Sequence, residues 1–166
     1  SDFRTLEGTG EVMELSVHLD EDDLIVSPPF PFEFNDEEVV LSNVELSDET
    51  TSITVDGEVL MTSEAPIELD IIGELDLSLL YPRYVNFVTS GTLSFEGEVR
   101  GTLANPQLDD GRATLNNASV DHTSLLLGLS ELNGELAFDG ERVTLIDIEG
   151  TAGTGAATVG GTIGIE

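Results

Sequence analysis

The residues best suited to chemistry in this chain are carboxylates in two stretches that look like loops. Asp109 and Asp110 lie in GTLANPQLDDGRATL (101–115), and DEDD (20–23) forms a second acidic run. Such oxygens suit calcium, but neither stretch has the alternating Asp spacing of an EF-hand or the repeat of a calcium β-roll. We therefore expect solvated acidic loops. Asn105-Pro106 and Asp110-Gly111 predict a corner between strands, because Pro cannot donate to a ladder and Gly permits a positive-φ turn.

Neither histidine lies in a catalytic pattern. Asp121, His122 and Ser124 are triad residue types, but neighbours in an extended segment point to opposite faces and a triad needs convergent side chains. His18 has no His or Cys companion nearby, so no zinc site is predicted. The chain has no Cys, no Trp to stack on sugars and no lysine for a Walker-type phosphate grip. We expect no enzymatic activity, no cofactor and no metal.

The charge of the chain is strongly one-sided. It carries 34 Asp and Glu against 5 basic residues, all Arg, for a formal net charge of −29. This charge repels phosphates and anionic head groups, which argues against nucleic-acid binding and against peripheral membrane docking. The chain is nevertheless 39% hydrophobic, too apolar for a disordered acidic tail. The acid favours solubility, as in a saline habitat, and it would also let a protein expose apolar surface elsewhere.

Apolar and polar residues alternate almost everywhere along the chain. A period of two is typical of strands with one apolar and one wet face, and turn pairs recur between the runs. We therefore predict an all-β fold with an antiparallel sheet. The residues predicted to share its apolar face are Met13, Leu15, Val17, Leu19, Phe30, Phe32, Phe34, Ile53, Val55, Val59, Met61, Ile67, Leu69, Ile71, Leu93, Phe95, Val99, Leu115, Leu136, Phe138, Val159, Ile163 and Ile165.

Two features interrupt or repeat this pattern. Leucines in GELDLSLLYPRYV (73–85) have helical spacing, which predicts one short helix near 75–85 that ends or kinks at Pro82. GTLSFEGE (91–98) recurs as GELAFDGE (134–141), which indicates an elongated sheet built from degenerate strand–turn–strand units. Residues 1–166 are therefore interpreted as a single segment of a longer repetitive protein. An ordinary sandwich whose hairpins converged on similar sequences remains the alternative.

The apolar face leaves two architectures open. A sandwich would bury it against a second sheet, whereas a curved single sheet would leave it lining a trough. The long polar faces and the few bulky aromatics favour the trough, whose flexible aliphatic side chains would accept acyl chains.

The order of short motifs after residue 66 resembles the repetitive β-rich region of the TamB/AsmA-like family of bridge-like lipid transfer proteins. The motifs are PIELDIIGELDLSLL (66–80), GTLSF (91–95), GTLANPQL (101–108), GRATL (111–115), LSELNGELAF (129–138), GTAGTG (150–155) and GTI (161–163). Residues 1–65 fit more loosely, in VVLSNVELS (39–47) and TSITVDGEV (51–59). Each motif is degenerate, so the resemblance rests on their order.

The resemblance implies a β-taco, a long curved sheet whose apolar concave groove carries phospholipid between the inner and outer membranes. It also implies a periplasmic location, an inner-membrane anchor that this stretch lacks, and an outer-membrane barrel of the BamA/TamA type as partner. The residues of the apolar face would then be the groove lining that contacts acyl chains. Two alternatives remain: a chaperone-like factor for the assembly of outer-membrane β-barrel proteins, and an acidic structural sandwich or solenoid without a groove.

Overall fold

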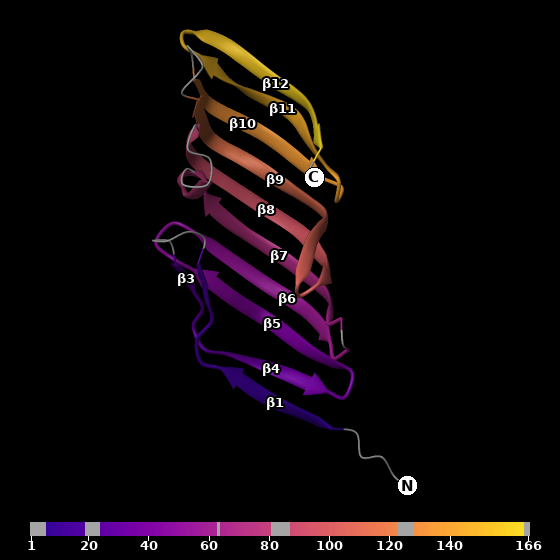
Figure 1. Ribbon diagram of the computed structural model, residues 1–166. Helices are drawn as coiled ribbons and strands as arrows, with labels where there is room; N and C mark the ends of the chain where they lie inside the picture. The colour runs from indigo at the N-terminus through magenta and orange to yellow at the C-terminus, as the bar shows by residue number, and fades with distance from the viewer. Residues whose placement is uncertain (1–5, 19–23, 63, 81–86, 123–127, 165–166) are drawn as a thin grey trace.

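The chain folds into one open antiparallel sheet in the computed structural model (Figure 1). The structure describes residues 6–18, 24–62, 64–80, 87–122 and 128–164. Ten strands follow one another in the order β1-β4-β5-β6-β7-β8-β9-β10-β11-β12, and a β2–β3 hairpin pairs with β5 off this path. The strands are β1 Glu7–Val12, β2 Ser16–His18, β3 Leu24–Val26, β4 Phe30–Asn35, β5 Glu38–Ser47, β6 Ser52–Leu60, β7 Pro66–Asp76, β8 Phe87–Thr102, β9 Asn105–His122, β10 Leu129–Phe138, β11 Arg142–Ala152 and β12 Gly155–Gly164. The predicted all-β, antiparallel class is confirmed.

The sheet forms a single layer. Figure 1 shows the strands as one ladder from β1 at one edge to β12 at the other, and in the described part of the chain no second sheet lies over it. The accessible surface is 11177 Å². A compact monomer of 17.7 kDa would expose only about 8,000 Å². The chain therefore leaves much more surface open to solvent than a compact globule of its mass.

The predicted helix is a single 3₁₀ turn, η1 (Leu77–Leu80). Leu75 still belongs to β7, where it pairs with Leu93, so the helical spacing of the leucines misplaced the start of the helix. Asp76 Oδ1 accepts the Ser78 N–H at 2.7 Å and so marks the change from strand to turn. Residues 81–85 of the prediction lie outside the described residues.

The predicted corner at Asp110-Gly111 is wrong. The turn between β8 and β9 lies at Leu103 and Ala104, and β9 runs without interruption from Asn105. Gly111 pairs with Gly97 inside the sheet, where a Cβ on Gly111 would lie 2.9 Å from the Glu96 carbonyl oxygen. Gly111 therefore serves close approach of two strands and not a turn.

Pro106 is tolerated inside β9 because one side of the strand is unpaired there. It pairs with Gly101 of β8, and β10 begins to pair with β9 only at Gly111. Proline is confined to such edge positions, since it has no N–H for a ladder.

The predicted strand through residues 13–19 is interrupted. Met13 and Leu15 lie between β1 and β2 and are exposed. The Ser27 N–H donates to the Leu15 carbonyl oxygen at 2.9 Å, and the Leu15 N–H donates to Ser27 Oγ at 3.0 Å. These two bonds hold the base of the β2–β3 hairpin, so the chain leaves the main ladder here.

A row of β-bulges crosses the C-terminal strands. Asn117 in β9, Glu131 in β10 and Asp147 in β11 have positive φ, and pairing shifts register beside each of them. The residue that follows each one is buried: Ala118, Leu132 and Ile148 are 1%, 5% and 2% exposed. With Leu77 of η1 they form the core cluster of the described residues. The bulges therefore line up across three neighbouring strands beside this cluster.

Candidate functional site: the apolar face of the sheet

The candidate site is one whole face of the sheet. Residues directly opposite each other in an antiparallel ladder project to the same face, so the strand register defines its rows. One row runs Ile53, Gly73, Phe95, Ala113, Leu136, Leu145. A second row runs Val44, Val55, Ile71, Gly97, Gly111, Phe138, Val143, Ile163. We call the surface that contains these rows the apolar face.

Most of the predicted groove residues lie on the apolar face. They are Phe30, Phe32, Phe34, Ile53, Val55, Val59, Ile67, Leu69, Ile71, Leu93, Phe95, Val99, Leu115, Leu136, Phe138, Val159 and Ile163. Phe30 and Ile67 are buried, Ile163 is 57% exposed, and the others are half-buried. An apolar surface of this extent on a single-layer sheet is available for contact.

The remaining predicted residues do not lie in these rows. Met13 and Leu15 precede β2, and Met61 follows β6 in a bend where it is 58% exposed. Val17 lies in β2, which pairs with β3 off the main path of the described sheet. Leu19 and Ile165 lie outside the described residues.

Sequence reasoning missed the buried residues beside the bulges. A bulge lets two successive residues face outward, so the apolar spacing there is three instead of two. This spacing is visible in LSNV (41–44), LNNA (115–118), LSEL (129–132) and LIDI (145–148). Each of these stretches contains a positive-φ residue, Asn43, Asn117, Glu131 or Asp147, followed by a buried one. A search for this three-residue spacing would have found Val44, Ala118, Leu132 and Ile148.

Two glycines of β1 on the apolar face lie under aromatic rings from the adjacent strand. Gly8 and Gly10 of β1 face Phe34 and Phe32 of β4, and a Cβ on Gly8 would lie 2.8 Å from Phe34 Cζ. The Phe32 and Phe34 ring centroids are 6.1 Å apart. The Phe32 and Phe34 rings pack over the backbone of β1, so the surface above these glycines is apolar.

The opposite face is polar and acidic. Its rows include Asp56, Asp70, Glu98 and Asp110, which pair directly across four strands. Like charges opposite each other repel, so this face depends on solvent and on its few cations. Glu38, and less strongly Glu68, raise the pKa of the Glu58 carboxyl above its ordinary value, with partial desolvation adding to the effect.

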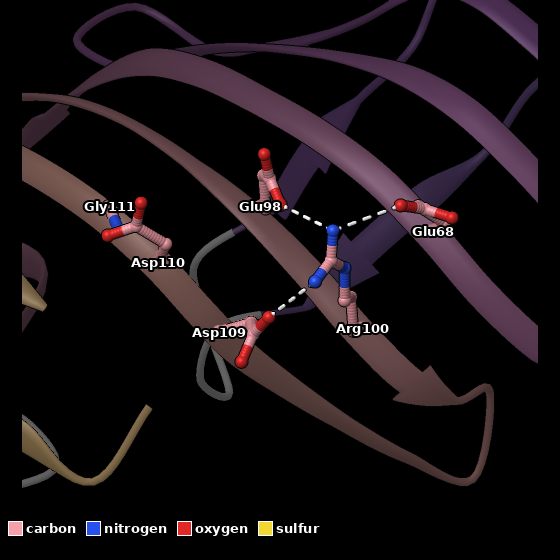
Figure 2. Close-up of polar contacts among 6 residues, drawn as sticks. All are labelled: Glu68, Glu98, Arg100, Asp109, Asp110 and Gly111. Atoms are coloured by element: carbon pink, nitrogen blue, oxygen red, sulfur yellow. Dashed lines mark hydrogen bonds and ion pairs between the residues drawn. The ribbon is translucent and has the colours of Figure 1, made fainter. Parts of the chain in front are cut away.

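Arg100 is the centre of the one ion-pair cluster among the described residues. Figure 2 shows its guanidinium among carboxylates from β7, β8 and β9. The nitrogen–oxygen distances are 2.9 Å to Glu98, 3.1 Å to Glu68 and 2.8 Å to Asp109. Glu98, Glu68 and Asp109 hold the pKa of Arg100 above its ordinary value. Asp109, the unpaired residue at the register shift in β9, is therefore a partner of Arg100 as well as an exposed residue.

The described part of the chain offers an extended apolar surface for binding. Asp110 Oδ1 accepts the N–H of the next residue, Gly111, at 2.9 Å (Figure 2). Among the residues that the structure describes, no three potential metal ligands gather into a group. In the same part of the chain, no helix is both long and apolar enough to cross a membrane. The arrangement can bury apolar groups on one face while the other stays hydrated. No protein-family model, curated protein or solved structure matches this chain.

Proposed function

We propose that the chain is a bridge segment whose apolar face carries phospholipid between the inner and outer membranes. The observation that carries the proposal is the row from Val44 to Ile163, aliphatic or aromatic except at Gly97 and Gly111, on a sheet with no second layer in its described part. Each acyl CH₂ that leaves water gains about 0.8 kcal/mol, so a continuous apolar surface offers a path without a hydration barrier. The acidic opposite face keeps such a segment dissolved.

We further propose that the sheet closes into a trough along its apolar face. The bulge row in β9–β11 supports this proposal, because bulges favour bending of a strand and Ala118, Leu132 and Ile148 lie buried directly after them. Ten strands on one path, spaced by about 4.8 Å, give about 43 Å of trough, which is part of a bridge across an envelope. The motif order of residues 66–166 further supports a TamB/AsmA-like segment, with a periplasmic location, an inner-membrane anchor and a BamA/TamA-type barrel as partner.

The direct experiment is mass spectrometry of the purified chain for bound phospholipid, followed by transfer of a labelled phospholipid between vesicles. A charge can be placed in the proposed path by the single substitutions Val55→Asp, Phe95→Asp and Phe138→Asp. Each should abolish transfer, because an acyl chain that covers the carboxylate would remove it from water without a compensating partner. Thr114→Asp adds the same charge to the polar face next to Ala113 and should leave transfer unchanged. Circular dichroism of each variant checks the fold. Transfer that persists in folded Phe95→Asp would contradict the proposal.

A chaperone-like role in assembling β-barrel proteins is the second candidate. It is favoured by β12 (Gly155–Gly164), an edge strand of the described sheet that contains no ionisable residue. Edge strands without charge or proline accept an added strand. Photocrosslinkers at Thr158 and Thr162 of β12 would then capture unfolded barrel polypeptide, whereas the phospholipid proposal expects lipid adducts from Val55 and Phe95. A purely structural sheet predicts neither.

A further inference from the structure

The apolar face carries no ionisable side chain in the four rows of described residues that cross the middle of the sheet. Two of them are the rows through Phe95 and Phe138. The other two connect β5 with β9 and run Leu41, Gly57, Leu69, Val99, Leu108 and Val39, Val59, Ile67, Gly101, Pro106. Every residue in the four rows is aliphatic, aromatic, proline or glycine. A partner that packs against these rows therefore buries no charged or hydrogen-bonding side chain of this chain.

Large side chains cover the glycines of these rows. A Cβ on Gly73 would lie 3.0 Å from Phe95 Cζ, and a Cβ on Gly97 would lie 3.0 Å from Leu108 Cδ1. Leu108 Cδ1 would also lie 3.7 Å from a Cβ on Gly111. Because each gap left by a glycine is filled by a neighbour, the face can pack against a second sheet without large voids.

The apolar face is large enough for a stable interface between two copies of the chain. β5, β10 and β12 have 10 residues each, which at about 3.4 Å per residue gives a width of about 34 Å. With a length of about 43 Å over the ten strands of the main path, each copy would cover about 1,400 Å². Two copies would then bury about 2,800 Å², and stable homodimers bury about 2,000–5,000 Å². The accessible surface of 11177 Å² exceeds that of a compact monomer of this mass by about 3,000 Å², which is enough to supply this area.

The acidic face would point away from such an interface. Two packed sheets lie about 10 Å apart, and the polar side chains project outward from both of them. The carboxylates of the row through Asp56 and Asp70 would therefore lie farther from those of the other copy than the Debye length of about 8 Å at 0.15 M ionic strength. Near 10 mM the Debye length is about 30 Å, so the net charge of −29 on each copy would oppose association there.

We infer that, without lipid, two copies of this chain pack through their apolar faces into a two-layer sandwich. The two faces are identical, so a twofold axis can match them, and the closed dimer leaves neither apolar face in water. This inference goes beyond the proposed function and does not need it, because no second layer covers the face in the described part of the chain. A phospholipid and a second copy would compete for the same surface.

The first test is sedimentation velocity of the purified chain after lipid has been removed on a hydrophobic resin. At about 1 M salt the particle should have twice the 17.7 kDa mass of one chain. Its dimerisation should be at least tenfold tighter there than at about 10 mM salt, because salt screens the repulsion between the two acidic chains. A monomer at both ionic strengths, or an open series of larger oligomers, would overturn the inference.

Two neighbouring isoleucines of β7 supply a matched pair of variants. Ile71 lies on the apolar face, in the row with Val55, and Ile72 projects to the opposite face and is 57% exposed. Ile71→Asp should abolish the dimer, because the sandwich would bury an unpaired carboxylate from each copy. Ile72→Asp adds the same charge to the same strand and should leave the dimer intact. Circular dichroism of each variant checks the fold, and a dimer that persists in folded Ile71→Asp would overturn the inference.

A second pair in β12 tests the interface at positions where a substitution spares the core. Ile163 is on the apolar face and 57% exposed, and Thr162 is exposed on the opposite face. Ile163→Asp should weaken dimerisation about tenfold or more, and Thr162→Asp should not. Equal weakening by the two variants would assign the association to pairing between β12 edges, which would overturn the inference.

The last test separates this inference from the proposed function. Dioctanoyl phosphatidylcholine, added below its micelle concentration, should convert the dimer into a monomer that carries lipid, as detected by sedimentation and native mass spectrometry. Lipid bound to an intact dimer would show that the apolar faces are not the interface and would overturn this inference alone. A dimer that binds no lipid, and that Ile71→Asp disrupts, would overturn the proposed function and support this inference.

Discussion

The two halves of the sheet hold their apolar side chains differently. In the C-terminal half, β8–β12, bulged strands gather Ala118, Leu132 and Ile148 with Leu77 of η1 into one buried cluster. In the N-terminal half, β1–β6, Phe30 and Val44 are buried but stand outside that cluster, and most of the apolar face is half-buried.

Buried and half-buried side chains of the apolar face contribute differently to folding and to ligand contact. A side chain that is almost fully buried contributes its full transfer free energy to folding, while a half-exposed one keeps apolar area for a ligand. The cluster should therefore stabilise the C-terminal half, while the half-buried side chains of both halves keep apolar area for an acyl chain.

The largest effect should come from truncation inside the cluster. Ile148→Ala removes a side chain that is only 2% exposed, and it should lower the free energy of unfolding by about 3 kcal/mol through lost burial and the cavity left behind. The measurement is urea denaturation followed by circular dichroism. The matched change in the other half is Val55→Ala, at a half-buried position of β6, which should cost about 1 kcal/mol or less. Similar losses for the two variants would contradict the division between the halves.

Glycine-to-alanine substitutions test the same difference between the two halves, with a smaller expected change in the free energy of unfolding. In β11, a Cβ on Gly150 would lie 2.6 Å from the Ser130 carbonyl oxygen and 2.8 Å from Leu132 Cδ2, so Gly150→Ala should destabilise by about 2 kcal/mol. In β1, a Cβ on Gly8 would meet only the ring of Phe34, which can swing toward solvent. Gly8→Ala should therefore cost about 0.5 kcal/mol. Thermal unfolding of the two variants beside the wild-type chain measures both effects, and a larger loss for Gly8→Ala would reverse the comparison.

Alternation alone was enough to predict the regular strands. β6 and β7 pair without a register shift from Ser52 to Val59, so each residue keeps the face that its position in the sequence predicts. The same rule placed Ile53, Val55 and Ile71 correctly on one face. Period-two reasoning works here because the ladder is continuous and one face is apolar.

Local signals failed where pairing across strands decided the structure. Asp110-Gly111 has the residue types of a turn, but the glycine opposite, Gly97, lets two strands approach closely and the ladder continues. The bulge at Asn117 moves Ala118 to the buried side, which a strict period of two assigns to the wrong face. The Asn117 N–H donates to Asn133 Oδ1 of the next strand at 3.0 Å, and this contact joins residues 16 positions apart in the sequence. In both cases a residue on the neighbouring strand, which the local sequence does not identify, determines the backbone conformation.

The smallest expected effect concerns charge in the N-terminal half. Glu38 and Glu68 raise the pKa of Glu58 above its ordinary value of 4.5, so the folded chain holds this proton more tightly than the unfolded chain. The free energy of unfolding of the wild type therefore decreases as the pH rises above about 4.5. Above this pH the Glu58→Gln variant should be more stable than the wild type, and below it the two proteins should be equally stable. The gain should be small because the group is exposed to solvent and screened by salt. Unfolding midpoints of the two proteins across this range measure it. Since Glu38 is the largest cause, the gain from Glu58→Gln should shrink in a Glu38→Gln background, and a gain of the same size there would assign the shift to another source.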